Sequence, residues 1–367
     1  MIFDISDKAF KTIFDESLHL PQRWDGKDFA RKLDSLLMHY DSQVRKVNTV
    51  KPNAYNTVTL KEIREVSKLL RQTVKEYFNG LPAKAYDKFA EVMDHLVKVP
   101  LNTLEASGDI SKQRIPYEAL FRAARVEDNI PYPRTRLFHT PYNLRSKVST
   151  NRYSIAGFPS LYLGTSLKLC CDEIKAVQGK DLIIASAFRP ESLDIDPTEI
   201  QVIDLSVKPQ DFWRQEDEKE LGRKISRARI CNKEVRSAYL LWYPLIAACS
   251  FIRANKEEPF AAEYIIPQLL MQWARANTMD NKEVVLTGIR YFSCASVKAS
   301  DMGFNYVFPT SGLSDEVEPL YCKYLVKVFA MTEPVYLHEY ENITACEMDL
   351  KKKEFQYIGR KRNIVIK

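Results

Sequence analysis

The sequence predicts an α+β protein in which a small helical bundle precedes a mixed-sheet domain. Over roughly the first hundred residues, apolar side chains recur at spacings of three and four, the period of an amphipathic helix. After a Ser-Gly-Asp segment at residues 107–109, short apolar runs of strand length alternate with helical stretches. The 367 residues, 45% of them hydrophobic, suffice for two or three domains with cores of their own.

Three amphipathic helices are expected in the N-terminal region. The first covers residues 28–47, and the second begins at a capping box formed by Thr59 and Glu62. Gly80 ends the second helix, and the third occupies residues 82–100, with a proline suited to its first turn. Such helices pack into a bundle. This bundle carries no catalytic constellation, so it is either a partner-binding or lid-like domain or a cap that buries its own apolar stripes.

The second region is expected to hold the strands and helices of a catalytic domain. Ser166 caps a helix that follows a short strand, and residues 238–253 predict a buried helix with Pro244 as a kink or an early break. Another helix is expected from residue 263. Strand-like runs occur at residues 120–122, 161–163, 182–188, 200–205, 287–294, 304–308, 321–331 and 334–340. The expected domains are a helical one at 1–110, a catalytic one at 111–312, and strands with a basic tail at 313–367 that pack on the catalytic domain.

The composition indicates a cytoplasmic protein that binds neither membranes nor nucleic acid. No apolar run is long enough to cross a membrane, and the N-terminus is acidic where a signal peptide would be basic. The seven cysteines lack CxxC spacing and lie mostly in apolar runs, which favours reduced, buried thiols. The net charge of +6 is too small and too evenly spread to predict nucleic-acid binding.

Several common classes of enzyme have no motif here. The eleven glycines never form GxGxxG or GxxxxGK[ST], so neither a nucleotide-cofactor fold nor a P-loop is supported. GxSxG and HExxH are absent, and the five histidines show no metal-ligand spacing. We therefore expect no metal and no resident cofactor.

Residues 151–173 concentrate three kinds of chemistry in one supersecondary unit. Arg152 and Tyr153 precede a Gly-x-Pro turn, a short strand contains Tyr162, and the following helix carries Glu173. Residues at helical spacing from Glu173 are apolar, so its carboxylate lies along the buried stripe and needs a partner or a function. A salt bridge to a nearby arginine and a catalytic role are both open for Glu173. Phosphate binding and a simple surface turn are both open for Arg152 and Tyr153.

A basic segment runs from Arg122 to Arg152. It holds seven Lys and Arg residues against two acidic residues, which accounts for most of the formal charge of +6. Guanidinium groups bind phosphate oxygens in pairs, so an anionic ligand is a fair inference. One or two of these cations would suffice for a phosphate site, and the others would be solvated loop residues.

The order of several short motifs resembles the RES-domain family, which is named for its Arg, Glu and Ser. The most specific part is RYSIAGFPSLYLG, which begins at Arg152 and is followed by CCDE, which ends at Glu173. The resemblance covers residues 115–310 and leaves the N-terminal helices and the C-terminal tail unexplained. The other motifs are FR at 121–122, HTPY at 139–142, EYIIPQLL at 263–270, GIRYFSC at 288–294 and GFNYVF at 303–308.

The resemblance implies a fold similar to that of ADP-ribosyltransferase toxins. It also implies degradation of NAD⁺ at the nicotinamide–ribose bond, by hydrolysis or by phosphorolysis. NAD⁺ would then be a consumed substrate rather than a cofactor, with inorganic phosphate as the co-substrate of phosphorolysis. Many members of the family are toxins of toxin–antitoxin pairs, so a small helix-turn-helix antitoxin is the implied partner.

Carried over by position, the resemblance makes Arg122, Arg152, Tyr153 and Glu173 catalytic candidates. The two arginines would hold the pyrophosphate, and Tyr153 would stack on the nicotinamide or order the ribose. Glu173 would stabilise the oxocarbenium charge that develops on the ribose. Because nicotinamide leaves as a neutral molecule, no strong general acid is required.

The family serine is matched less directly. Ser293, in GIRYFS, is the favoured match and would orient a hydroxyl or the nucleophile. Some family members place the serine just before a glutamine, where this chain has Pro267 before Gln268. Tyr162 and Gln268 are the implied substrate-binding residues.

Two other functions fit the same pattern. The first is an ADP-ribosyltransferase that passes the same sugar to a protein or nucleic acid. The second is an interaction module whose catalytic site has lapsed and whose N-terminal helices bind a partner. The sequence does not determine the acceptor, the existence of an antitoxin or the oligomeric state.

Overall fold

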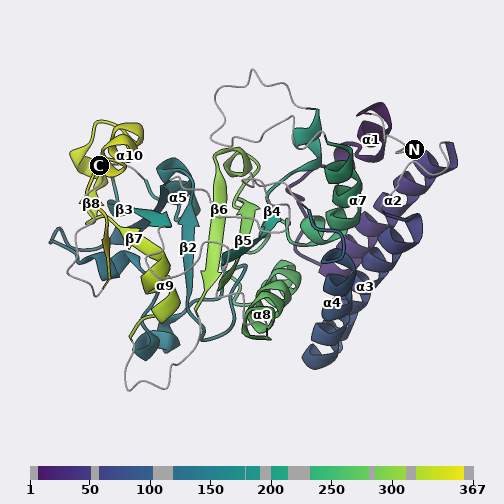
Figure 1. Ribbon diagram of the computed structural model, residues 1–367, viewed down its shortest axis with the longest axis horizontal. Helices are drawn as coiled ribbons and strands as arrows, with labels where there is room; N and C mark the ends of the chain where they lie inside the picture. Colours follow the sequence, from purple (N-terminus) through teal and green to yellow (C-terminus); the bar gives the residue numbers. More distant parts are fainter. Residues whose placement is uncertain are drawn as a thin grey trace.

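The computed structural model describes residues 7–50, 58–101, 119–177, 179–190, 200–213, 232–280, 286–310 and 320–358. Within them the fold is α+β, as predicted, and nine strands form one open mixed sheet in the order β4-β5-β6-β2-β1-β3-β7-β9, with β8 paired to β3. In Figure 1 the N-terminal helices lie beyond the β4 end of the sheet, and α10 lies beside its β7 end. The strands are β1 (Leu120–Val126), β2 (Ser160–Gly164), β3 (Leu182–Pro190), β4 (Ile200–Leu205), β5 (Leu286–Phe292), β6 (Phe304–Pro309), β7 (Phe329–Met331), β8 (Val335–Tyr336) and β9 (Gln356–Tyr357).

The strand pairs of the described sheet are antiparallel, except that β4 and β5 are parallel. β1 pairs with β3 along its whole length, from Leu120 to Val126. Its pairing with β2 is limited to Phe121 and Gly164. Residues 121–123 of β1 and 162–164 of β2, around this single pair, form part of the wall of the candidate site.

The predicted helices are present, with shifted bounds. Thr59 Oγ1 accepts a hydrogen bond from Glu62 N at 3.2 Å, and the Glu62 side chain accepts one from Thr59 N at 2.8 Å, which is the predicted capping box. The N-terminal helices are α1 (Asp7–Ile13), α2 (Phe29–Val50), α3 (Leu60–Phe78) and α4 (Pro82–Leu96). The later ones are α5 (Leu167–Glu173), α7 (Lys233–Ala248), α8 (Ile265–Asp280), α9 (Lys323–Val328) and α10 (Ile343–Leu350).

Helices α7 and α8 lie between the N-terminal helices and the sheet (Figure 1). Every residue of α7 from Val235 to Ala248 is buried, and Pro244 lies inside the helix without ending it. One hydrophobic core joins α2, α3, α4, α7, α8 and β5. The N-terminal helices therefore bury their apolar stripes against the rest of the chain, and the domain boundaries stay a prediction.

Different helices pack on the two faces of the sheet. On one face, residues such as Leu163 and Phe308 pack with α9. On the other face, β1 and β3 pack with α5 and α10, and β5 packs with α7 and α8. Successive side chains along a strand point to opposite faces, so neighbours in sequence belong to different cores. The candidate site lies on the face that α5 covers.

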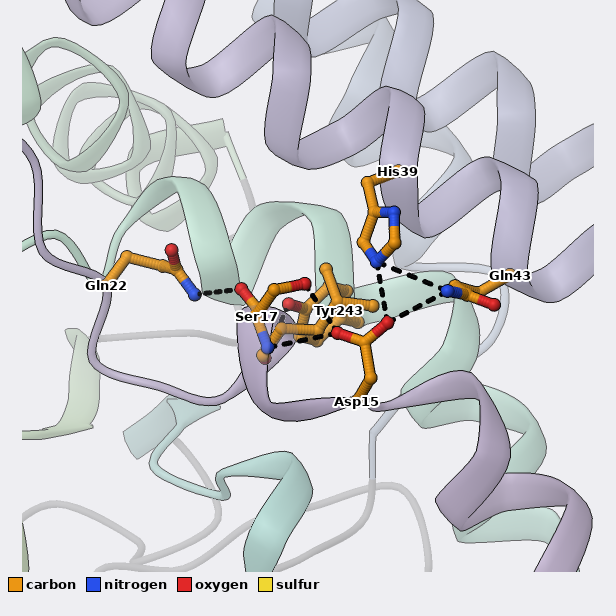
Figure 2. A network of polar contacts seen from close by, with 7 residues as sticks. Asp15, Ser17, Gln22, His39, Gln43 and Tyr243 are labelled. Atoms are coloured by element: carbon orange, nitrogen blue, oxygen red, sulfur yellow. Dashed lines mark hydrogen bonds and ion pairs between the residues drawn. The ribbon is translucent and has the colours of Figure 1, made fainter.

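A polar network fastens the segment between α1 and α2 to two helices (Figure 2). Asp15 Oδ2 accepts a hydrogen bond from Gln43 Nε2 at 2.8 Å and lies 2.7 Å from His39 Nε2. Asp15 Oδ1 accepts a hydrogen bond from Ser17 N at 3.0 Å. From α7, the Tyr243 hydroxyl donates to a backbone carbonyl of the same segment at 2.8 Å. The network fixes the path of the chain into α2.

The C-terminal segment corrects one prediction. A strand over residues 321–331 is wrong for most of that run, because α9 occupies it and β7 contains its last three residues. Aromatic and β-branched residues favour a strand there, but Leu325 and Val328 stand at helical spacing and are both buried. Residues 334–340 contain the predicted strand only as β8, followed by a short 3-10 turn. The basic cluster at 360–362 lies outside the described residues.

Six cysteines belong to the described residues, and all six are buried free thiols, as expected. Cys231 lies outside them. No helix in the described ranges has the length and apolar character needed to span a membrane.

Candidate active site

A cavity of about 440 Å³ opens on the sheet face that α5 covers. Strands β1, β2, β5 and β6 contribute to its walls, together with the end of α5 and the segment between α7 and α8. Four of the predicted site residues line it, namely Arg122, Arg152, Tyr162 and Glu173. The other polar or ionisable lining residues are Asn151, Cys170, Lys175, Arg253, Lys256, Tyr264, Tyr291, Cys294 and Asn305.

Glu173 supplies the carboxylate of the cavity. It ends α5, which Ser166 caps as predicted by accepting a hydrogen bond from Leu169 N at 3.2 Å. The side chain is exposed rather than buried in the apolar stripe. Asn305, a buried residue of β6, donates from Nδ2 to Glu173 Oε1 at 2.6 Å. The hydrogen-bond partner of this carboxylate is thus an amide rather than an arginine.

Arg152 uses two of its donors within the fold. Its Nη1 donates to Cys249 O at 3.1 Å, and its Nη2 donates to Phe251 O at 2.7 Å. The guanidinium also lies 4.9 Å from the centre of the Tyr264 ring. Arg152 therefore holds the end of α7, and the chain that follows it, against the cavity wall.

Arg122 contributes to the cavity wall, but its guanidinium is directed elsewhere. Phe121 and Ala123 belong to the core under α5, so alternation along β1 directs Arg122 to the opposite face. There its Nη1 donates to Phe138 O at 2.9 Å. Burial lowers the pKa of Arg122 to about 10, so the side chain stays charged at neutral pH.

The aromatic lining comes from Tyr162, Tyr264 and Tyr291 rather than from Tyr153. Tyr153 is fully buried, and its ring lies 4.7 Å from that of Tyr291. It therefore supports Tyr291 from behind instead of facing a ligand. Burial raises the pKa of both Tyr162 and Tyr291, so their hydroxyls stay protonated at neutral pH.

Ser293 and Gln268 are not among the lining residues. Ser293 follows β5 and is fully buried, and its hydroxyl accepts a hydrogen bond from Ala295 N at 3.1 Å. Its neighbours Cys294 and Ala295 line the cavity instead. Gln268 lies on α8 and donates from Nε2 to Asn151 O at 3.2 Å, so it contacts the chain that leads into Arg152.

Two thiols of the cavity are poor nucleophiles. Burial raises the pKa of Cys170 and of Cys294, which keeps both protonated at neutral pH. The Cys170 thiol also donates to Phe121 O at 3.1 Å. Their place in the cavity wall is therefore best explained by packing.

The sequence prediction missed three cations that line the cavity. Arg253 and Lys256 lie between α7 and α8, and Lys175 follows α5. Tyr264 and Asn305 were also missed, although both stand inside motifs of the resemblance, EYIIPQLL and GFNYVF. Those motifs carried a usable signal, whereas nothing in the local sequence distinguishes Lys175 or Lys256 from other surface lysines.

The charge of the cavity is mainly positive around one carboxylate. Arg152, Lys175, Arg253 and Lys256 line it together with Glu173. Cations of this kind bind phosphate oxygens, and a carboxylate stabilises a positive charge that develops on a ligand. Among the described residues, no group of His, Cys, Asp and Glu side chains could hold a metal ion. The arrangement suits a phosphate-bearing ligand that becomes cationic at its reacting carbon.

Comparison with known proteins finds a bacterial relative whose name describes it as a toxin. The chain is 27% identical over 320 residues to a protein of Bacillus subtilis (strain 168) named "Putative toxin YopC"; these residues are 86% of this chain and 67% of that protein. No family model matches the chain. No solved structure matches it either. Membership of the RES-domain family and an ADP-ribosyltransferase-like fold therefore stay predictions.

Proposed function

We propose that this chain degrades NAD⁺ by breaking its nicotinamide–ribose bond, through hydrolysis or phosphorolysis. The observation that carries the proposal is the contact between Glu173 and Asn305 in a cavity whose other charged lining residues are cations. NAD⁺ has a pyrophosphate that cations bind and a ribose carbon whose charge a carboxylate stabilises in the transition state. The ordered motifs shared with the RES-domain family support the same activity.

The proposed reaction needs few groups. The bond between the ribose carbon and the nicotinamide nitrogen breaks, and its electron pair leaves with neutral nicotinamide. The ribose becomes oxocarbenium-like, and Glu173 stabilises this charge. Asn305 holds one carboxylate oxygen, which leaves Oε2 for the ribose. Water or phosphate then bonds to the same carbon and yields ADP-ribose or its 1″-phosphate; with water, the surplus proton passes to Glu173 or to solvent.

A toxic role follows from the proposed activity and from the name of the relative. Cells depend on NAD⁺, so an unrestrained enzyme that consumes it stops growth. We therefore propose that the chain harms the cell that makes it unless an antitoxin partner restrains it.

The first prediction concerns Glu173. Purified protein is incubated with NAD⁺, with and without phosphate, and nicotinamide release is followed by chromatography. Wild type releases nicotinamide, and Glu173→Gln lowers the rate by about a hundredfold, because loss of a charge that stabilises the transition state costs about 3 kcal/mol. Glu91→Gln, which changes an exposed carboxylate of α4, is the control and keeps the wild-type rate.

Two results would contradict the proposal: no nicotinamide release by wild type, or equal release by wild type and Glu173→Gln. The products identify the acceptor. ADP-ribose indicates hydrolysis, its 1″-phosphate indicates phosphorolysis, and a labelled macromolecule in lysate indicates an ADP-ribosyltransferase. Expressed in bacteria, wild type lowers NAD⁺ and stops growth, whereas Glu173→Gln does neither.

A further inference from the structure

Residues 252–258, which follow α7, carry two of the cavity's cations. Arg253 and Lys256 both line the cavity, and Lys256 is exposed. The acidic Glu258 belongs to the other side of this segment, where it lines a second cavity with Asn255 and Phe260. The segment thus presents positive charge to the candidate site and turns a carboxylate away from it.

The segment is fastened at its start by Arg152. The Arg152 guanidinium donates to Cys249 O and Phe251 O, two of the three carbonyls just before the segment begins. The ring of Tyr264 contacts two guanidinium groups, with its centre 4.9 Å from that of Arg152 and 5.5 Å from that of Arg253. Arg152 therefore sets the position of Arg253 through the backbone and through this ring.

Other contacts fix the remaining backbone of the segment. Ile252 N donates to Gln22 O at 2.8 Å, which ties the segment to the chain before α2. Ala254 N donates to Glu263 Oε1 at 3.1 Å, and Glu263 is buried. Arg253 closes the segment on itself, since its Nε donates to Asn255 O at 3.1 Å and its Nη2 donates to the Glu258 carbonyl. The backbone of the segment and the Arg253 guanidinium are thus held in place before any ligand binds.

The predicted phosphate-binding arginines are already engaged. Arg122 donates to Phe138 O, and Arg152 donates to two carbonyls. Lys256 is exposed, and the hydrogen bonds of Arg253 within the loop use its Nε and Nη2, which leaves its Nη1 for a ligand. A guanidinium that is already in position, beside an exposed ammonium, binds phosphate oxygens at a lower ordering cost than two free side chains.

We propose that residues 252–258 form the pyrophosphate-binding loop of the site. Arg253 and Lys256 bind the pyrophosphate, and Arg152 is a positioning residue that acts through the loop. This assignment rests on the proposed function for the identity of the ligand, a dinucleotide, but not for the binding of a diphosphate.

The second prediction tests the loop with ADP as the probe, since ADP carries a diphosphate and undergoes no bond cleavage here. Binding is measured by calorimetry. Lys256→Met raises the dissociation constant for ADP about tenfold, and the double variant Arg253→Met/Lys256→Met raises it further. Lys61→Met, an exposed lysine of α3, leaves it unchanged. Lys256→Met keeps the loop's hydrogen bonds, so a folding defect does not explain the weaker binding of ADP by this variant.

Arg152 is distinguished from a ligand-binding residue by coupling. Arg152→Gln weakens ADP binding in the wild-type background but has no further effect in the Arg253→Met/Lys256→Met background, because the loop it positions has lost its cations. A merely structural role would not produce this loss of effect. Additive losses would show that Arg152 binds phosphate directly and would overturn its assignment.

Wild type that fails to bind ADP, or loop variants that bind it as tightly as wild type, would overturn the loop assignment. Failure of the proposed function has a different signature. If ADP binding depends on Lys256 but wild type releases no nicotinamide from NAD⁺, then the loop assignment stands and the proposed reaction is wrong.

Discussion

Among single residues, Asn305 has the contact with the clearest chemical consequence. Its amide donates to Glu173 Oε1 at 2.6 Å from a buried position on β6. Glu173 itself is exposed at the end of α5, where a free glutamate would sample several rotamers. Asn305 therefore acts on the carboxylate as a positioning residue.

The third prediction follows from this contact. Asn305→Leu keeps a similar side-chain volume but removes the donor, so the rate of nicotinamide release falls about tenfold while KM for NAD⁺ changes little. Steady-state kinetics check this split. Asn277→Leu removes an exposed amide of α8 that donates to Trp273 O and serves as the control. A raised KM with an unchanged rate constant would show that Asn305 binds substrate instead.

The residues between Arg152 and Glu173 show which features of single site residues can be predicted from the local sequence. The sequence identified Arg152, Tyr162 and Glu173, and all three line one cavity. It could not show that Tyr153 is buried behind Tyr291, since the direction of a loop side chain depends on what packs against it. It also could not show that Arg152 bonds to carbonyls 97 and 99 residues away along the chain.

At the level of elements, close packing between β5 and β6 restricts Gly288. The two strands pair through Ile289 and Val307, which places Gly288 opposite the Phe308 ring. A methyl group added at Gly288 would lie 2.4 Å from a Phe308 ring carbon. Real side chains do not approach this closely, so the ring or the strand must move.

The fourth prediction is that Gly288→Ala lowers the free energy of unfolding by about 1 to 3 kcal/mol, the usual cost of overpacking a core. Urea denaturation measures it. The double variant Gly288→Ala/Phe308→Leu loses less stability than the sum of the two single variants, because the smaller side chain makes room for the methyl group. Additive losses in the double variant would show that the clash is not the cause.

Secondary structure was predictable where local chemistry is strong. The capping box of Thr59 and Glu62 and the Ser166 cap both formed as expected, since each is satisfied by neighbouring residues alone. Residues 321–331 were predicted wrongly, because their strand propensity is outweighed by the helical burial of Leu325 and Val328. That burial depends on the sheet face beneath them.

For the whole molecule, two buried titratable groups give opposite dependences of stability on pH. Burial raises the pKa of Asp41, whose Oδ1 accepts a hydrogen bond from Ser67, to about 6. Burial lowers the pKa of His139, whose Nε2 accepts a hydrogen bond from Cys322 N, to about 4. The stability contributed by protonated Asp41 is lost as pH rises through 6, whereas that of neutral His139 is lost as pH falls from about 6.5 towards 4.

The fifth prediction isolates Asp41 from His139. Asp41→Asn imitates the protonated carboxyl, so it unfolds with nearly the wild-type free energy at pH 4. At pH 7 it is more stable than wild type by about 1 to 2 kcal/mol, after allowance for partial solvent access. Denaturation at several pH values measures the difference. Asp87→Asn, on the exposed side of α4, is the control. A difference that stays constant with pH would contradict the prediction.

The N-terminal helices are joined to the candidate site through the backbone. Gln22 O, in the segment that leads to α2, accepts the hydrogen bond of Ile252 N, and the core of α2 to α4 continues into α7. The loop with Arg253 and Lys256 therefore begins where the helical region and the sheet region meet. This contact gives the N-terminal helices a part in shaping the cavity.

The sequence by itself determined the α+β class, most helices and strands, and a carboxylate, an arginine and a tyrosine that share one cavity. These depend on periodicity, capping and motif order, which are properties of neighbouring residues. Only the tertiary structure decided that Arg122 and Arg152 donate hydrogen bonds to backbone carbonyls. It also decided that Asn305 donates to Glu173. It placed Arg253 and Lys256 in the wall of the same cavity. These contacts join segments far apart in the chain. Tertiary packing therefore determines which side-chain donors of the cavity are left to bind a ligand.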